Sequence, residues 1–103
     1  MFKKICICGS MRFYTTMILQ AERLTSEGYI VLMPFLKKDG TNDIQLDLMH
    51  KQKIDMCDEV LIVNTNGITK YIGQSTLDEI AYAHKQGKEI FYLDLILASK
   101  GKN

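Results

Sequence analysis

The sequence predicts an α/β fold: a Rossmann-like, flavodoxin-like parallel sheet of four strands with helices on both faces. Short apolar runs alternate along the chain with longer segments of helical periodicity. This alternation is typical of parallel sheets whose strands are joined by right-handed helical crossovers. The apolar runs are also continuous, without regularly spaced polar residues, and this indicates strands that are buried on both faces.

Each expected strand is a short apolar run that ends at a recognisable residue. The strands are expected at residues 5–8, 29–33, 59–63 and 89–93. Gly9 and Ser10 close the first strand, and Pro34 stops the second because proline cannot extend a central strand. The third run, EVLIV, is the clearest strand signal in the chain and ends at Asn64.

The first helix is expected at residues 13–27, between the first two strands. Met17, Ala21 and Leu24 form one apolar stripe at helical spacing. Gly28 follows at the position where glycine commonly ends a helix. The segment therefore has both the periodicity and the stop signal of an amphipathic helix.

The second and third helices are defined by different signals. Residues 43–56 form the second helix, from which Ile44, Leu48 and Met49 are expected to face inward. The third helix follows a glycine-containing loop and ends near residue 86. Its start has a capping-box pattern, in which the Ser75 hydroxyl is the N-cap and Asp78 follows three residues later.

Length, charge and apolar content restrict the classes of protein and partner. The 103 residues are assigned to a single domain over 1–95 and a C-terminal tail over 96–103. The net charge is only +1, so no nucleic acid polymer is expected as a partner. No apolar stretch approaches the ~20 residues of a membrane span, and no signal peptide is recognised. We therefore expect a cytoplasmic protein without a membrane partner.

The cysteines and histidines are not expected to form a metal site. Cys6 and Cys8 lie two residues apart on a strand, so both face the same side, and Cys57 is distant in sequence. All three are expected to be buried, reduced thiols. With two histidines and no clustered ligand residues, neither a metal nor a cofactor is expected.

The first candidate binding site follows from the fold class. In parallel α/β sheets, ligands bind beyond the carboxyl ends of the strands, and this rule places Gly9, Ser10 and Asn64 on one edge. Gly9 allows close backbone approach, and the following N–H groups with Arg12 suit a phosphate or carboxylate. The alternative is an ordinary strand-to-helix turn with a surface arginine.

Two further residues could carry chemistry at the same edge. Glu79 is expected in the first turn of the third helix, where the helix dipole helps keep a carboxylate ionised. An ionised carboxylate can attack an anomeric carbon, although Glu79 could simply complement the dipole and Ser75 could simply cap the helix. His50, late in the second helix, is an acid or base near neutral pH or part of a solvated helix end.

Together these residues resemble the nucleoside 2-deoxyribosyltransferase-like superfamily, in particular its short bacterial and phage members, and the related 2′-deoxynucleoside 5′-phosphate N-hydrolases. The resemblance extends over nearly the whole chain. It is carried by residues 8–12, 50–55, 58–64, 71–76 and 79–80.

The resemblance implies cleavage of an N-glycosidic bond, with Glu79 as the nucleophile at C1′ of a deoxyribose. It implies that the turn at residues 9–12 receives the sugar or a 5′-phosphate of a small-molecule nucleoside or nucleotide. Asn64, Gly73 and Ser75 are further candidate substrate contacts. The resemblance also implies a homodimer or larger homo-oligomer in which the neighbouring subunit closes the site.

Three positions depart from the superfamily pattern. Cys6 stands where characterised N-hydrolases carry a tyrosine, and His50 stands where they carry an aspartate. Gly73 stands where the transferases usually carry an aspartate, six residues before the nucleophile. A thiol does not hydrogen-bond like a phenol, and imidazole differs from carboxylate in charge and geometry. His50 or Tyr71 is a candidate to take over a lost role.

The leading hypothesis is an N-glycosidase or deoxyribosyltransferase that acts on a nucleoside or its 5′-monophosphate. In it, Glu79 attacks C1′, and His50 protonates the leaving base or orients Glu79. The alternative is a non-catalytic module that uses the same glycine turn to bind a nucleotide or an ADP-ribose-like metabolite. A purely structural oligomerisation domain is less consistent with the polar and glycine residues that gather on this edge.

Overall fold

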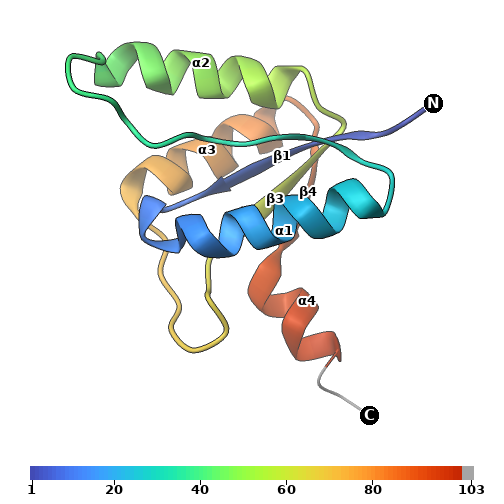
Figure 1. Ribbon diagram of the computed structural model, residues 1–103. Helices are drawn as coiled ribbons and strands as arrows, with labels where there is room; N and C mark the ends of the chain where they lie inside the picture. The colour runs from blue at the N-terminus through green and yellow to red at the C-terminus, as the bar shows by residue number, and fades with distance from the viewer. Residues whose placement is uncertain (101–103) are drawn as a thin grey trace.

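The computed structural model describes residues 1–100 and contains a four-stranded sheet (Figure 1). The strands are β1 (Lys4–Gly9), β2 (Ile30–Leu32), β3 (Glu59–Val63) and β4 (Glu89–Tyr92). Their order is β2-β1-β3-β4, and every neighbouring pair is parallel. This is the flavodoxin-like order, in which the direction of winding reverses between β1 and β3. The predicted fold class is confirmed.

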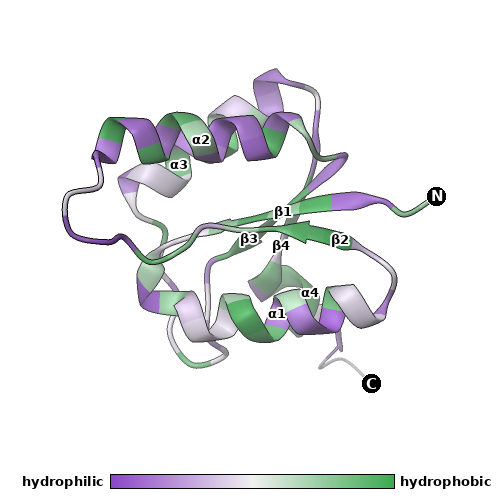
Figure 2. Ribbon diagram, turned by 45° about the horizontal axis from the view of Figure 1, so that its top comes forward, coloured by the Kyte–Doolittle hydropathy of each residue, from purple (hydrophilic) through white to green (hydrophobic). Residues whose placement is uncertain are grey.

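Helices cover both faces of the sheet. Within residues 1–100 they are the 3-10 helix η1 (Met11–Phe13) and the α-helices α1 (Tyr14–Ser26), α2 (Asp43–Asp55), α3 (Gln74–Lys85) and α4 (Leu93–Lys100). Figure 2 shows α2 and α3 on one face, and α1 and α4 on the other. The reversal of winding after β2 explains this division, because the crossover from β1 to β2 uses one face and the next two crossovers use the opposite face.

The helix α4 is an element that the sequence analysis did not predict. Leu93, expected as the end of the fourth strand, is buried and begins α4 directly after β4. Residues 96–100 of the expected tail belong to this helix, and residues 101–103 lie outside the described residues. The segment LDLILASK is short and mostly apolar, so it lacks the polar stripe that marks a longer amphipathic helix.

The sheet separates two hydrophobic cores because successive side chains of a strand point to opposite faces. Toward α1 and α4 the buried side chains are Ile5, Ile7, Phe13, Met17, Leu24, Met33, Leu61, Val63 and Leu93. Toward α2 and α3 they are Cys6, Cys8, Ile54, Cys57, Val60, Ile62 and Ala83. Two of the three cysteines therefore come from β1, and all three lie on the α2/α3 face as buried thiols.

The expected inward face of α2 is wrong. Ile44 and Leu48 are 73% and 58% exposed, and Met49 is 41% exposed. The buried residues of α2 are instead His50 and Ile54, four residues apart in its C-terminal half. Hydrophobicity alone points to the wrong side of this helix because one of its two buried side chains is a histidine.

The expected capping box at the start of α3 is also wrong. Gly73 occupies the N-cap position, and no side chain caps the helix. A Cβ on Gly73 would lie 3.1 Å from the Tyr71 hydroxyl oxygen, so the ring packs directly on this glycine. The helix therefore begins at Gln74, Ser75 lies exposed in the first turn, and the Gln74 amide donates a hydrogen bond to Asp78 at 2.9 Å.

Candidate active site at the carboxyl edge of the sheet

Gly9 ends β1 where two backbones come very close. A Cβ at this position would lie 2.5 Å from the carbonyl oxygen of Val63 and 3.0 Å from the Met17 methyl carbon. Contact at 2.5 Å with a backbone atom cannot be relieved by a side-chain rotation, so only glycine fits without moving β3. Close strand packing is thus sufficient to explain a glycine here, whatever binds at the following turn.

Ser10 and Arg12 organise the turn that follows β1. The Ser10 hydroxyl accepts a hydrogen bond from the Arg12 backbone N–H at 3.3 Å and caps η1. The Arg12 guanidinium lies 3.6 Å from the centre of the Tyr71 ring. Since Tyr71 packs on Gly73, these contacts connect the first turn to the beginning of α3. The turn after β1 and the N-terminus of α3 therefore form one continuous surface.

Asn64 forms hydrogen bonds with other residues of the fold. Its side-chain amide donates to Asp94 Oδ1 at 3.0 Å, and its side-chain oxygen accepts from the Asp94 backbone N–H at 3.1 Å. The Asn64 backbone oxygen accepts from the Tyr71 N–H at 3.0 Å. Asn64 is buried and joins β3 to α4, so these contacts account for its side chain without a ligand.

The structure brings together two residues that the sequence analysis placed on separate helices. His50 Nε2, from α2, lies 3.8 Å from Glu79 Oε1, from α3. The side chains of His50 and Glu79 are 7% and 12% exposed. His50 is therefore not part of a solvated helix end, as one interpretation of the sequence proposed. It lies under the two helices against the carboxyl half of β1.

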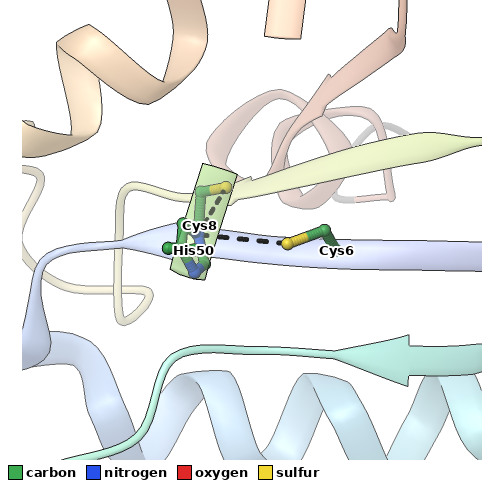
Figure 3. Close-up of side chains that lie close together, drawn as sticks. All are labelled: Cys6, Cys8 and His50. Carbon is green, nitrogen blue, oxygen red and sulfur yellow. Dashed lines mark hydrogen bonds between the residues drawn. The ribbon is translucent and has the colours of Figure 1, made fainter. Parts of the chain in front are cut away.

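The thiols of β1 complete this cluster. Cys8 Sγ lies 3.2 Å and Cys6 Sγ 3.9 Å from His50 Nε2 (Figure 3). The sequence analysis expected no clustered ligand residues, yet the Sγ and ring nitrogen atoms of these three side chains lie within 4.8 Å of one another. The sequence does not reveal the cluster because His50 is more than forty residues from the cysteines and comes from another element.

Burial determines the protonation of the cluster. It lowers the pKa of His50 to about 4, with Lys53 adding to the effect, so the imidazole is neutral at pH 7. Burial, which is the largest cause, and the nearby charge of Asp47 together raise the pKa of Glu79 to about 7, while the Cys8 thiol partly opposes the shift. Burial also keeps Cys8 a neutral thiol by raising its pKa.

Two expectations about Glu79 change as a result. Because α3 begins at Gln74, Glu79 lies in the second helical turn and not in the first. The helix dipole acts mainly within the first turn, so it does not dominate this carboxyl group. Desolvation is instead the largest influence on the pKa of Glu79. It favours the protonated form over the ionised form that the sequence analysis expected.

Sequence reasoning missed two neighbours of Glu79, namely Asp47 and Cys8. Asp47 lies one helical turn before His50, and its charge acts on Glu79. It also pairs with Lys51 at 3.1 Å, which is the i,i+4 pattern of a helix surface. The three-residue spacing from His50 could have identified Asp47, since residues three apart share a helix face.

Two cavities, one beside α1 and one beside β4 and α4, both lie away from this cluster. The first, of about 300 Å³, is lined by Ile5, Leu24 and Tyr29, among others, and lies toward α1 and α4. The second is bounded by β4 and α4. Glu79 lines neither of them.

Comparison with known proteins identifies the fold. Searches with the sequence match no protein-family model and no curated protein. The structure matches the 2-desoxiribosyltransferase from Leishmania mexicana with a TM-score of 0.69 and 19% identity, over 87% of this chain and 63% of that one. The chain has the deoxyribosyltransferase-like fold.

A second solved structure with this fold is the CMP N-glycosidase BcmB from Clostridium botulinum. It matches with a TM-score of 0.59 and 19% identity, over 87% of this chain and 70% of that one. The chain thus spans less than two thirds of the Leishmania protein and about two thirds of the clostridial one. In residues 1–100, none of the helices has the length and apolar character needed to span a membrane.

Proposed function

We propose that this protein cleaves the N-glycosidic bond of a nucleoside or nucleotide, as an N-glycosidase or deoxyribosyltransferase, with Glu79 as the nucleophile. The main support is the pairing of Glu79 with neutral His50 at the carboxyl half of β1, in a fold shared with a transferase and an N-glycosidase. A desolvated carboxylate is a strong nucleophile because little solvation must be removed before it reacts. The low exposure of Glu79 supports this assignment.

In the proposed reaction, a carboxylate oxygen of Glu79 forms a bond with C1′ of the sugar. The bond between C1′ and the base nitrogen breaks, its electron pair stays on that nitrogen, and a proton from water neutralises the departing base. Water or a second base then attacks C1′ and releases the carboxylate. Two displacements at one carbon retain its configuration. This step requires ionised Glu79, and a pKa of about 7 leaves a substantial ionised fraction at neutral pH.

We assign His50 to orientation of Glu79 and not to protonation of the leaving base. With a pKa of about 4, the ring carries no extra proton to donate at neutral pH. Gly9, Ser10 and Arg12 are proposed to receive the sugar or its 5′-phosphate, because the Arg12 guanidinium is exposed beside the N-terminus of α3. Gly73 and Ser75 border the same surface.

The test is release of free base from deoxynucleosides and their 5′-monophosphates, measured by chromatography. Glu79→Gln keeps the size of the side chain and is expected to lower turnover at least about 100-fold. Asp78→Asn is the matched control, since it neutralises the neighbouring, exposed acid of the same helix, and it is expected to keep turnover within about twofold. Unchanged turnover in Glu79→Gln would exclude this nucleophile.

A second candidate function is binding without catalysis. It is favoured by Cys6 and His50, which stand where related hydrolases carry a tyrosine and an aspartate, and by the neutral state of His50. The ligand would be a nucleotide or an ADP-ribose-like metabolite held at the turn after β1. Tight binding by calorimetry, with no base released over hours, would support this function over the enzymatic one.

We also propose that a second copy of the chain covers the outer surface of α2. Ile44 and Leu48, four residues apart, expose apolar side chains on one side of this helix, and the exposed Met49 follows Leu48. Light scattering is expected to give a dimer or larger oligomer, and Leu48→Glu is expected to dissociate it. Leu19→Glu on α1 is the control, because Leu19 and Leu48 are both 58% exposed. A monomeric wild-type protein would contradict this proposal.

We also propose that the protein is located in the cytoplasm. Cys6, Cys8 and Cys57 are all buried as free thiols. Thiols persist in reducing compartments, whereas secreted domains of this size commonly form disulfides. Cell fractionation that recovers the protein outside the cytoplasm would contradict it.

A further inference from the structure

Cys6, Cys8 and His50 form a group of donor atoms that the proposed reaction does not use. The two sulfur atoms face the same ring nitrogen, His50 Nε2, at 3.9 and 3.2 Å. All three side chains are buried, and Glu79 Oε1 approaches the same nitrogen at 3.8 Å. Figure 3 shows the two thiols on one strand with the ring against them. Three potential metal ligands from β1 and α2 thus lie within 4.8 Å of one another, and Glu79 of α3 lies beside the nitrogen of the group.

The group is unsuited to nucleophilic catalysis by cysteine. A catalytic thiolate requires a protonated imidazole or another positive charge nearby, which lowers the pKa of the thiol. Here the hydrogen bond with Cys8, together with burial, raises the pKa of Cys6. Burial raises the pKa of Cys8 and lowers that of His50, so all three are neutral. The buried ion pair of a cysteine hydrolase is therefore absent from these residues.

We propose that Cys6, Cys8 and His50 bind a thiophilic divalent cation such as Zn²⁺, with Glu79 as the fourth ligand. Two sulfurs, one imidazole nitrogen and one carboxylate oxygen are a normal tetrahedral ligand set for zinc. Two thiolates neutralise the double positive charge of the ion, and coordination by the Glu79 carboxylate gives the complete ligand set one net negative charge.

The distances in the cluster suit this geometry. Zinc binds sulfur at about 2.3 Å and nitrogen at about 2.0 Å, so a tetrahedral site separates the two donors by about 3.5 Å. The observed separations of 3.2 and 3.9 Å from Nε2 to the two sulfurs lie on either side of this value. The 3.8 Å separation of Nε2 and Glu79 Oε1 must shorten to about 3.3 Å, a shift that a side-chain rotation can supply.

The metal-free arrangement is then the protonated form of the same site. Each thiol S–H bond is replaced by a bond from sulfur to the ion, and a protonated Glu79 loses its proton as its oxygen binds the ion; the two thiol protons and this carboxyl proton pass to solvent. The Nε2 lone pair binds the ion, and the ring keeps its proton on Nδ1, an atom that is buried without a hydrogen-bond partner among residues 1–100. No oxidant or reductant is required.

A bound ion would compete with the proposed reaction, and this consequence depends on the proposed function. An ion that coordinates Glu79 removes the carboxylate that attacks C1′ and fixes the imidazole that orients it. Zinc is therefore expected to inhibit base release at least about 10-fold, and a chelator is expected to restore it. Base release that continues unchanged in protein loaded with the ion would overturn this consequence.

The binding test uses the full chain and does not depend on activity. The reduced, chelator-treated protein is titrated with Co²⁺ without oxygen, and then with Zn²⁺. We expect one ion per chain, the sulfur-to-cobalt charge-transfer band and intense visible bands of tetrahedral thiolate coordination, and a dissociation constant for Zn²⁺ below about 1 µM. A spectrum of hydrated cobalt alone would overturn the proposal.

Variants then test the individual ligands. Cys8→Ala and His50→Gln are expected to weaken binding at least about 100-fold, and Glu79→Gln about 10-fold with an altered cobalt spectrum. Cys57→Ala is the matched control, because Cys57 is an equally buried thiol outside the ligand group, and it should bind like the wild type. Circular dichroism checks that each variant is folded. Equal binding by folded Cys8→Ala and wild type would overturn the site.

The two proposals can fail separately. Cobalt binding without any base release would support the cation site and exclude the proposed enzymatic function. Base release by a protein that binds no ion would support the proposed enzymatic function and exclude the cation site.

Discussion

The two faces of the sheet are built from the same strands but have different chemistry. Toward α1 and α4, β1 contributes Ile5 and Ile7 to an aliphatic core. Toward α2 and α3, the alternate residues of the same strand are Cys6 and Cys8, which contact His50. One face therefore obtains its stability from apolar burial, whereas the other contains buried ionisable groups whose desolvation opposes folding.

The largest expected effect distinguishes neighbouring residues of β1. Ile7→Ala removes a fully buried aliphatic side chain and is expected to lower the free energy of unfolding by about 3–4 kcal/mol. Cys8→Ala removes one sulfur atom and its contact with Nε2, for a loss of about 1–2 kcal/mol. Urea unfolding of the metal-free proteins measures both. Equal losses of unfolding free energy in the two variants would mean that the two faces of the sheet contribute equally to stability.

The next largest effect is the pH dependence of stability that Glu79 causes. Its pKa of about 7 in the folded protein is above the ordinary value, so the unfolded chain loses this proton more readily. The group therefore destabilises the metal-free protein increasingly as pH rises from about 4.5 to 7, by up to about 3 kcal/mol. Glu79→Gln is expected to be more stable than the wild type at pH 8 and similar to it at pH 4. A variant less stable at both values would contradict this.

Asp94 provides a contrast on the other face. Its hydrogen bond from the Asn64 amide lowers its pKa, so its stabilising contribution is present above the ordinary carboxyl value and is lost as pH falls. Asp94→Ala leaves the buried Asn64 amide without this partner and is expected to cost about 1–3 kcal/mol at pH 7. The difference between variant and wild type should shrink in acid, as thermal melts at both pH values will measure.

The smallest effect is at the exposed edge that joins the two faces. Tyr71→Leu removes the ring beneath the Arg12 guanidinium and is expected to cost about 0.5–1 kcal/mol. If Arg12 binds a phosphate, the same variant should raise KM for a nucleoside monophosphate more than for the nucleoside. Equal changes in KM for both substrates would show that Arg12 does not bind the phosphate.

The sequence is sufficient for the fold class, although not for α4, because the signals of the strands and of their alternation with helices are local and strong. Continuous apolar runs such as EVLIV identify buried parallel strands, and their alternation with helical segments leaves few possible topologies. The start of α3 was misassigned because the contact of Tyr71 with Gly73, and not a side-chain cap, accompanies the start of that helix. The face of α2 was misassigned because His50, a polar residue, is one of its buried side chains.

The candidate site was only partly predictable. Glu79 and His50 could be selected by their resemblance to a family pattern, but their separation of 3.8 Å is a tertiary property. Spacing in β1 predicted that Cys6 and Cys8 face one side, yet it could not predict which helix they meet. The raised pKa of Glu79 also follows from packing, which a helix-dipole argument based on sequence position does not include.

The alternation of isoleucine and cysteine along β1 also makes the protein unusually sensitive to a shift of one residue. A shift of β1 by one residue relative to β2 and β3 would turn the isoleucines toward His50 and the thiols toward α1. Strand hydrophobicity would hardly change, so such a chain could still form a sheet while losing both the sulfur donors and the fit of its aliphatic core. In this strand, the order of the residues ICIC therefore determines which side chains meet His50 and which pack against α1.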